Sequence, residues 1–166
     1  KNQRLFLYDT REKRNKKIDE STYDEFENLA WSPDGRRLAY AAPAGNSFRR
    51  VKLYGVDGGA SAFVTTDRYD SSSPAFSADG KAVISAGRDR VLRIWDVATG
   101  KLSRAVRLQG DVAQSSGTAL SADGRLFAGH DATTLAIWDT ETGQELSRMP
   151  APPWAGQGAN LLFSAD

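Results

Sequence analysis

The sequence predicts an all-β fold built from repeated four-stranded units, and three observations support this prediction. A Ser-X-Asp-Gly pattern, whose last copy keeps only its first three residues, recurs at steps of 45, 44 and 43 residues, starting at Ser32, Ser77, Ser121 and Ser164. An aromatic residue that precedes a turn recurs at steps of 46, 41 and 43 residues, at Tyr8, Tyr54, Trp95 and Trp138. No segment shows a helical apolar period over a useful length. A four-stranded repeat of roughly 40–45 residues is typical of a β-propeller blade.

The segment from Ala75 to Gly100 is a complete run of strand, turn, strand, turn, strand and turn. Its strands are Ala75–Ser77, Lys81–Ala86 and Val91–Asp96, and its turns are Ala78–Gly80, Gly87–Arg90 and Ala98–Gly100. Asp-Gly and Thr-Gly suit these turns because glycine adopts a positive φ without a Cβ clash. The other units are interpreted by comparison with this one.

The chain starts with half a blade. Gln3–Asp9 alternates as a strand does, with Leu5 and Leu7 on one side and Phe6 and Tyr8 on the other. A charged hairpin tip follows at 10–17, and a returning strand is expected to start at 17–19. The tip holds the basic residues Arg11, Lys13, Arg14, Lys16 and Lys17. It is either an anion-binding patch or a solvated turn between two outer strands, and the second interpretation is favoured.

The remaining strands follow from the same spacing. We expect them at Asn28–Trp31, Arg36–Ala42, Arg49–Val56, Ala60–Thr65, Leu102–Leu108, Gly117–Leu120, Arg125–Gly129, Thr134–Asp139, Glu145–Met149 and Asn160–Phe163. The 166 residues then form a single propeller or half-propeller domain of about 3.8 blades, three complete and one partial at each end. The expected boundaries are 1–27 (partial), 28–72, 73–116, 117–159 and 160–166 (partial).

The composition describes a globular chain without a strong electrostatic field. It is 40% hydrophobic and 26% charged, and 22 Lys+Arg against 21 Asp+Glu leave a formal charge of +1. No apolar run approaches the roughly 18 residues that a membrane helix requires. Nucleic acid and membranes are therefore not expected partners. The lack of cysteine excludes disulfides and thiolate metal sites and leaves the compartment undecided, with a slight preference for the cytoplasm.

Residues 83–166 resemble WD40 repeats. Ile-Trp-Asp stands at 94–96 and again at 137–139, and a Thr-Gly turn follows each copy. In that family a strand Ser/Thr, a turn Asp and the strand Trp form a buried hydrogen-bonded network with a His from the preceding loop. The resemblance assigns this structural role to Ser85, Asp89, Trp95, Asp131 and Trp138. The preceding loops at 67–73 and 110–116 have no histidine, so the fourth member of the network is missing.

The first half, residues 3–87, resembles the propeller blades of tricorn-type proteases and TolB-like proteins. The resemblance is carried by LAWSPDGRRLAYAA at 29–42, VKLYGVDGG at 51–59 and VTTDRYDSSSPAFSADGKAV at 64–83. Both families have propeller blades, so the predicted fold is the same for either. The change of pattern near Ala86–Asp89 is either natural divergence or a splice between two parents in an engineered chimera.

No arrangement of residues predicts an enzyme. His130 is the single histidine, and it is expected in an exposed turn between strands. Ser121 and Ser164 are not spaced from it as a catalytic triad requires. The numerous aspartates sit mostly in turns, where such carboxylates cap the backbone. No cofactor or metal is expected, and a small-molecule or glycan site in the channel has no residue signature.

Four loop residues are candidates for partner contact. Trp154 stands in the Pro/Gly-rich loop 150–158, where it either packs on the next blade or binds a partner. The other three are Tyr69, Arg88 and Arg90. Their loops are expected on the rims of the propeller.

An open stack of blades leaves an apolar face at each end. A face of about 400 Å² costs on the order of 10 kcal/mol when exposed, which is comparable to the stability of a whole domain. The chain begins at Lys1 and ends within a turn, so we expect either an excised or engineered segment or a complete chain that self-associates. In the second case, two copies would close a ring of seven or eight blades, with Gln3–Glu20 pairing with Asn160–Phe163 of the other copy.

The sequence therefore predicts a non-catalytic scaffold that binds proteins or peptides and forms a homo-oligomer. The alternative is the accessory propeller of a tricorn-like peptidase, gating peptide substrates.

Overall fold

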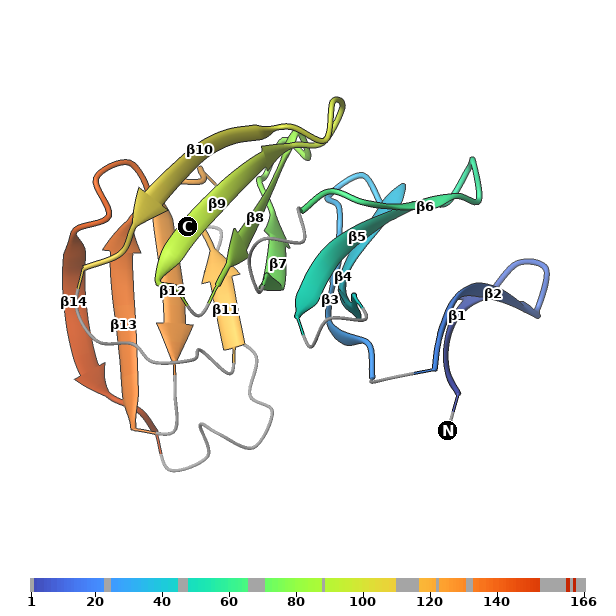
Figure 1. Cartoon of the computed structure of the whole chain (residues 1–166), viewed down its shortest axis with the longest axis horizontal. Coiled ribbons are helices and arrows are strands. Elements are labelled where there is room, and N and C mark those ends of the chain that lie inside the picture. The colour runs from blue at the N-terminus through green and yellow to red at the C-terminus, as the bar shows by residue number, and fades with distance from the viewer. Residues whose placement is uncertain are drawn as a thin grey trace.

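A computed structural model of the chain shows separate β-sheets arranged side by side (Figure 1). The structure describes residues 2–22, 25–44, 48–65, 71–87, 89–109, 117–121, 123–130, 133–152, 161 and 163. Every regular element within these ranges is a β-strand. In the same ranges there is no helix long and apolar enough to cross a membrane.

In the described part of the chain, fourteen strands form four antiparallel sheets. Their bounds are β1 (Gln3–Asp9), β2 (Arg14–Ser21), β3 (Glu27–Trp31), β4 (Arg37–Pro43), β5 (Arg49–Gly55), β6 (Ser61–Phe63), β7 (Ser72–Phe76), β8 (Ala82–Ala86), β9 (Val91–Asp96), β10 (Leu102–Arg107), β11 (Gly117–Leu120), β12 (Leu126–His130), β13 (Thr134–Asp139) and β14 (Glu145–Pro150).

Three of the sheets are complete blades in which each strand pairs with the next one in the chain. Blade two is β3-β4-β5-β6, blade three is β7-β8-β9-β10 and blade four is β11-β12-β13-β14. A two-stranded sheet, β1-β2, precedes them, and we call it the half-blade. The predicted all-β fold of four-stranded antiparallel blades is thus confirmed, and the described sheets do not close into a ring.

The repeating aromatic residue occupies one place in each complete blade. Tyr54, Trp95 and Trp138 lie in the third strand, opposite Leu38, Val83 and Phe127 of the second strand. Tyr8 has the same spacing to its turn in β1. The strands β1 and β2 therefore correspond to the third and fourth strands of a blade.

Apolar side chains fill the spaces between neighbouring sheets. The half-blade meets blade two through Leu5, Leu7 and Ile18, which pack on Leu38, Tyr40, Ala42 and Tyr54. Blades two and three meet through Ala39, Val51 and Val83. Blades three and four meet through Ile84, Leu92, Phe127, Ala136 and Trp138. Each blade is thus held by its neighbours along the chain.

The Ser-X-Asp-Gly pattern forms the same turn in every complete blade. The hydroxyls of Ser32, Ser77 and Ser121 donate to the carboxylate two residues later at 2.6–2.7 Å. Each serine hydroxyl also accepts the amide five residues later at 2.9–3.0 Å. The turn glycine adopts a φ of +68°, +68° or +73°. The local sequence therefore fixes the connection from the first strand to the second.

A second turn joins the third strand to the fourth. Asp139 accepts the amides of Glu141 and Thr142, and Asp9 accepts those of Arg11 and Glu12 in the half-blade. This compact turn lets β2 begin at Arg14 rather than at the predicted 17. The prediction of a hairpin tip over the whole of 10–17 is therefore wrong for its second half, residues 14–17, which belong to β2.

Other predicted strands agree with the structure to within a few residues. The largest difference among complete strands is β7, which spans Ser72–Phe76 instead of the predicted Ala75–Ser77. Strand β6 is shorter than predicted and spans only Ser61–Phe63. The strand pairing ends there because the Thr65 hydroxyl, rather than a backbone carbonyl, accepts the Val51 amide at 2.9 Å. The predicted strand Asn160–Phe163 lies partly outside the described residues, so it stays a prediction.

Candidate functional site

The structure brings together two members of the predicted network in blade three. The indole nitrogen of Trp95 donates to the Ser85 hydroxyl at 2.9 Å, and both side chains are buried. Asp89 instead accepts from the Arg93 guanidinium at 2.5 and 3.1 Å and from the Val91 amide at 3.2 Å. In the described hydrogen bonds, Asp89 therefore binds Arg93 and the backbone of its own turn, and not Ser85 or Trp95.

Arg93 is a buried residue that the sequence analysis missed. Its side chain is only 5% exposed, against 36% for Asp89. Burial alone would raise the pKa of Asp89, but the Arg93 guanidinium and the Val91 amide outweigh it, so this pKa lies below its usual value. The charge at the predicted network position thus compensates a buried cation. No local sequence signal marked this pair, because it forms between a turn and the strand that follows it.

Blade four uses a different partner for its tryptophan. The Trp138 indole donates to the backbone carbonyl of Gln109 at 2.8 Å, and Gln109 belongs to the segment after blade three. Gly129 takes the place that Ser85 holds in blade three, since each lies two residues after the register partner of the tryptophan. The hydroxyl acceptor is therefore absent in blade four, and the bond joins two blades. Asp131, the other predicted member, lies outside the described residues.

The prediction of an exposed His130 is wrong. His130 is the last residue of β12, with 1% of its surface exposed, and it pairs in register with Gly117 and Leu135. The strand continues one residue beyond the predicted end, which carries the imidazole into the interior. The residues around His130 carry no local signal for this extra strand residue, because its burial depends on the neighbouring strands β11 and β13.

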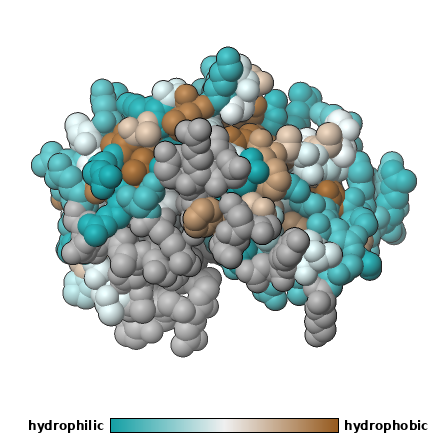
Figure 2. Space-filling model, in the orientation of Figure 1, coloured by the Kyte–Doolittle hydropathy of each residue, from teal (hydrophilic) through white to brown (hydrophobic). Residues whose placement is uncertain are grey.

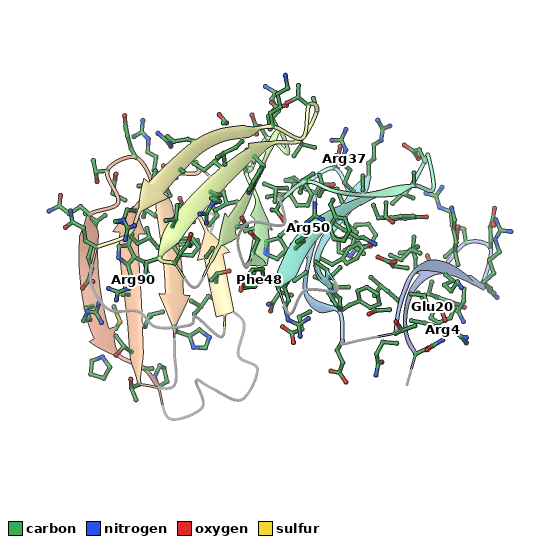
Figure 3. All side chains as sticks on the ribbon, in the orientation of Figure 1. Arg4, Glu20, Arg37, Phe48, Arg50 and Arg90 are labelled. Atoms are coloured by element: carbon green, nitrogen blue, oxygen red, sulfur yellow. The ribbon has the colours of Figure 1, made fainter. Side chains whose placement is uncertain are left out.

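Of the candidate partner contacts, the structure describes only Arg90. It is exposed and adopts a φ of +59° in the turn before β9 (Figure 3). Its carbonyl accepts the Leu108 amide at 2.9 Å. Tyr69, Arg88 and Trp154 lie outside the described residues, so their assignment as contacts stays a prediction.

The outer face of the half-blade is apolar and uncovered. Phe6 is 52% exposed and Tyr8 is 55% exposed. The residues that correspond to Tyr8 in the complete blades, Tyr54, Trp95 and Trp138, are at most 3% exposed. Tyr54 and Trp138 are buried by the sheet that precedes their own. No described sheet covers the corresponding face of β1.

The inner strand of blade two is uncovered as well. Leu29 is 52% exposed and Trp31 is 48% exposed, and both lie in β3. Phe76, the counterpart of Trp31 in blade three, is partly buried against the cluster that includes Ala39 and Val51 of blade two. Apolar side chains otherwise mix with polar ones on the face seen in Figure 2. No described side chains cover Leu29 and Trp31 to the extent that blade two covers Phe76.

A buried polar group fixes the half-blade on blade two. Asp19 of β2 accepts from the Tyr40 hydroxyl at 2.8 Å and from the Lys52 ammonium at 2.7 Å. The side chains of Lys52 and Asp19 are 18% and 11% exposed. Burial, with a contribution from Asp19, raises the pKa of Tyr40 above its usual value, so its hydroxyl stays a donor. This network joins β2 of the half-blade to β4 and β5 of blade two.

The basic residues of the hairpin are partly neutralised. Glu20 pairs with Lys17 at 2.6 Å and with Arg4 at 3.2 Å, and these contacts lower the pKa of Glu20 to about 2 (Figure 3). Arg14 pairs with Glu12. These pairings favour the interpretation of a solvated hairpin over that of an anion-binding patch.

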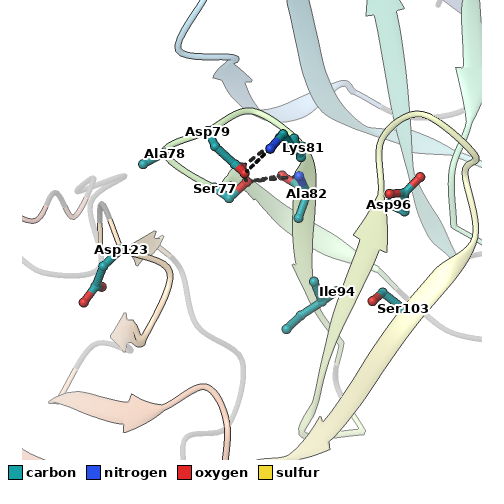
Figure 4. Close-up of a pocket in the computed structure, with 9 residues that line it drawn as sticks. All are labelled: Ser77, Ala78, Asp79, Lys81, Ala82, Ile94, Asp96, Ser103 and Asp123. Atoms are coloured by element: carbon teal, nitrogen blue, oxygen red, sulfur yellow. Dashed lines mark hydrogen bonds and ion pairs between the residues drawn. The ribbon is translucent and has the colours of Figure 1, made fainter.

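A cleft of about 480 Å³ lies between the turns of blades three and four (Figure 4). Its lining includes Asp79, Asp96 and Asp123, with Lys81 paired to Asp79 at 3.5 Å. Turn hydrogen bonds lower the pKa of each of these aspartates. Each of these carboxylates therefore accepts hydrogen bonds within its own turn. Within the described ranges no group of three or more His, Cys, Asp or Glu side chains is placed to hold a metal ion.

These features define a class of protein: a β-propeller built from four-stranded blades, with buried aromatic residues between them. A comparison with protein families matches residues 70–96 to the WD domain, G-beta repeat family. That match covers the start of blade three through its Ile-Trp-Asp strand. Blade three is thus similar to a WD40 repeat, as the sequence predicted, and the described sheets have the architecture of propeller blades.

Three relatives share about a third of their aligned residues with this chain. Transducin beta-like protein 3 of Homo sapiens is 32% identical over 104 residues, 57% of this chain and 13% of that protein. Tricorn protease homolog 2 of Streptomyces coelicolor is 32% identical over 111 residues, 61% and 10%. Nuclear distribution protein PAC1 of Arthroderma otae is 33% identical over 106 residues, 63% and 22%. The chain thus spans less than a quarter of the length of each.

The comparisons agree with the two patterns in the sequence. WD40 repeats generally act in protein interaction, and the match to that family lies in blade three. One of the relatives carries protease in its name. The WD domain match and the tricorn protease homologue thus correspond to the two resemblances in the sequence.

Proposed function

We propose that this chain is a non-catalytic protein-interaction scaffold whose half-blade end binds another protein surface, most simply a second copy. The single observation that carries the proposal is the exposure of Phe6 and Tyr8 on the face of β1 whose aromatic residue is buried in every complete blade. Large exposed apolar faces of this kind mark interaction sites. The WD40 class supports a partner that is a protein.

The second copy is argued from the number of blades. One chain supplies three complete blades and the half-blade, so two chains supply close to the seven or eight blades of a closed ring. Phe6 and Tyr8 would then lie against the last blade of the other copy. Asn160–Phe163 of that copy would enter the same blade as Gln3–Glu20. This contact is head-to-tail, and such contacts form a ring only if the rotation closes.

Solution mass tests this proposal directly. Light scattering across a concentration series should give about 36 kDa, twice the 18.0 kDa of one chain. Because lysines at positions 6 and 8 would be buried against apolar surface, Phe6→Lys with Tyr8→Lys should return the mass to 18.0 kDa. The matched control is Leu102→Lys, which changes a residue of similar exposure on β10 of blade three, away from both ends of the chain. A wild-type chain that stays monomeric at every concentration contradicts self-association.

A second candidate function is the accessory propeller of a tricorn-like peptidase that gates peptide substrates. The similarity to the tricorn protease homologue supports it. Binding of mixed short peptides to a monomeric chain, with no change in mass, would favour this function over the self-associating scaffold. The splice between two parents near Ala86–Asp89 stays a prediction, and the WD domain match at 70–96 runs through that point.

A further inference from the structure

We propose that the turn between β5 and β6 is a self-modification site, at which Asp57 reacts with the backbone of Gly58 and becomes isoaspartate. The Gly58 amide nitrogen attacks the carboxyl carbon of Asp57. The new C–N bond replaces the C–OH bond, and the hydroxyl leaves as water with the amide proton, which gives a succinimide ring. A second water molecule opens the ring at either carbonyl and yields aspartate or isoaspartate. The site lies within one turn of blade two, so it is independent of the proposed scaffold role.

Four Asp-Gly dipeptides in the chain have the composition that this reaction needs. Glycine offers the least hindrance, because no Cβ blocks the approach of its amide nitrogen to the preceding carboxyl carbon. The four dipeptides stand at 34–35, 57–58, 79–80 and 123–124. Three of them belong to the Ser-X-Asp-Gly turns, and the pair at 57–58 does not. The chain therefore contains three internal comparisons for the proposed site.

The three Ser-X-Asp-Gly turns keep both reacting groups occupied. The glycine amide, which has to lose its proton and attack, instead donates to the serine carbonyl at 2.9 Å in each turn. The carboxylate accepts from the serine hydroxyl at 2.6–2.7 Å and from the amide two residues later at 3.0 Å. These contacts lower the pKa of each aspartate, so the neutral acid, which is the form that loses water, is scarcer. Asp34, Asp79 and Asp123 are therefore expected to react slowly.

The turn at Asp57 leaves both reacting groups available. The Asp57 side chain is 80% exposed, and its contact with Arg36 is 3.9 Å long. Among the described residues, no hydrogen bond holds the Asp57 carboxylate or the Gly58 amide. The turn is closed by another group, since the Gly59 amide donates to the Gly55 carbonyl at 2.9 Å. An exposed turn of small and polar residues tolerates the backbone rotation that brings the amide nitrogen onto the carboxyl carbon.

A difference of one residue between the blades explains why the Gly58 amide has no acceptor. In blades three and four the corresponding turn begins with an aspartate directly after the buried tryptophan. That carboxylate accepts the amide three residues later, at 2.7 Å from Thr99 and 2.6 Å from Thr142. Blade two has Gly55 in place of the aspartate, and Gly58 stands where the other blades have threonine. A Cβ built on Gly55 would meet no described atom within 4 Å, so an aspartate fits there.

The modification changes the outer strand of blade two. Isoaspartate at position 57 adds one carbon to the backbone of the turn that leads into β6. This strand has only three residues, and its pairing with β5 begins at Tyr54 and Ser61, close to the turn. Hydrogen exchange in β6 should therefore become faster as isoaspartate accumulates, while exchange in β10 of blade three should stay the same.

Ageing of the folded 166-residue chain at mildly acidic pH and body temperature tests the site. Peptide mapping with electron-transfer fragmentation, which detects the extra backbone carbon, should find isoaspartate forming at position 57 at least tenfold faster than at 34, 79 or 123. In urea all four dipeptides should react at similar rates, because the turns that separate them are lost. Similar rates at the four positions in the folded chain would overturn the proposal, and so would isoaspartate at position 57 that forms only in urea.

Two variants of one residue connect the reaction with the missing carboxylate. Gly55→Asp should slow isoaspartate formation at position 57 at least threefold, because it gives the Gly58 amide the acceptor that blades three and four have. Gly55→Ala is the matched control, since it adds the Cβ without the carboxylate, and it should slow the reaction less. Equal rates in the two variants would contradict the role of the Gly58 amide and overturn the proposal.

Discussion

At the scale of single residues, Gly143 joins blade four to blade three through its lack of a side chain. Its φ is +74°, and a Cβ built there would lie 2.3 Å from the carbonyl oxygen of Arg107. Its own carbonyl accepts the Gln109 amide at 3.0 Å. Gly100 holds the corresponding turn position in blade three, with a φ of +65° and open space around it. The two glycines share a conformation but differ in surroundings.

This pair allows the interblade contact to be measured. Gly100→Ala should lower the free energy of unfolding by about 1–2 kcal/mol, the cost of a left-handed conformation for an L-residue. Gly143→Ala should cost a further 1–3 kcal/mol or so, because the methyl group also overpacks against backbone. Urea denaturation of both variants gives the difference. Equal losses would show that the turn of blade four does not press against β10.

The limits of sequence reasoning are visible at this scale too. The serines and aspartates of the Ser-X-Asp-Gly turns were predictable because their bonds are local, and the structure shows them within six residues of each other. Arg93 and His130 were not, because their burial depends on neighbouring sheets. Lys13 adopts a φ of +51° at the position where the other blades have glycine. A search for glycine in turns would therefore not find the turn of the half-blade. Local sequence patterns therefore predict the blades, whereas they do not predict which side chains are buried between blades.

At the scale of elements, the turns make stability depend on pH. The pKa values of Asp34 and Asp123 are lowered first by the serine hydroxyl of the turn, and that of Asp79 first by the Lys81 amide. A carboxylate whose folded pKa is lowered contributes stability above its ordinary value of 3.8, and this contribution is lost as pH falls through the folded pKa.

We therefore expect urea midpoints to stay level between pH 7 and about 5 and to fall below about pH 4. The variant Asp34→Asn/Asp79→Asn/Asp123→Asn should show a smaller fall over the same acid range, because an amide still accepts the backbone hydrogen bonds but does not titrate. Matching acid profiles for the variant and the wild type would locate the sensitivity elsewhere.

The connection of the half-blade to blade two depends on Asp19. Asp19→Ala should cost about 3 kcal/mol, since it leaves the Lys52 ammonium and the Tyr40 hydroxyl without this acceptor in a mostly buried place. Asp57→Ala is the control, because its contact with Arg36 is 3.9 Å long and both side chains are mostly exposed. It should change stability by less than about 1 kcal/mol. Thermal or urea unfolding of the two variants tests this contrast, and equal losses would contradict it.

At the scale of the whole molecule, the blades form a linear series in which each sheet packs on its neighbours. In such an arrangement stability is approximately a sum of blade and interface contributions, so the ends open more easily than the middle. The half-blade is the less stable end, since a two-stranded sheet is marginal without a covering layer. Blade three lies between two complete blades and shares apolar clusters with both of them.

Hydrogen exchange should display this order and also report what covers the half-blade. At low protein concentration, amides of β1 and β2 should exchange fastest and those of β8 and β9 slowest. If two copies close a ring, exchange in the half-blade should slow as concentration rises, while exchange in β8 and β9 stays the same, because their neighbours are already present. The Phe6→Lys/Tyr8→Lys variant should abolish this concentration dependence. Exchange that is independent of concentration, together with protected β1 amides, would mean that the chain itself covers the face of the half-blade.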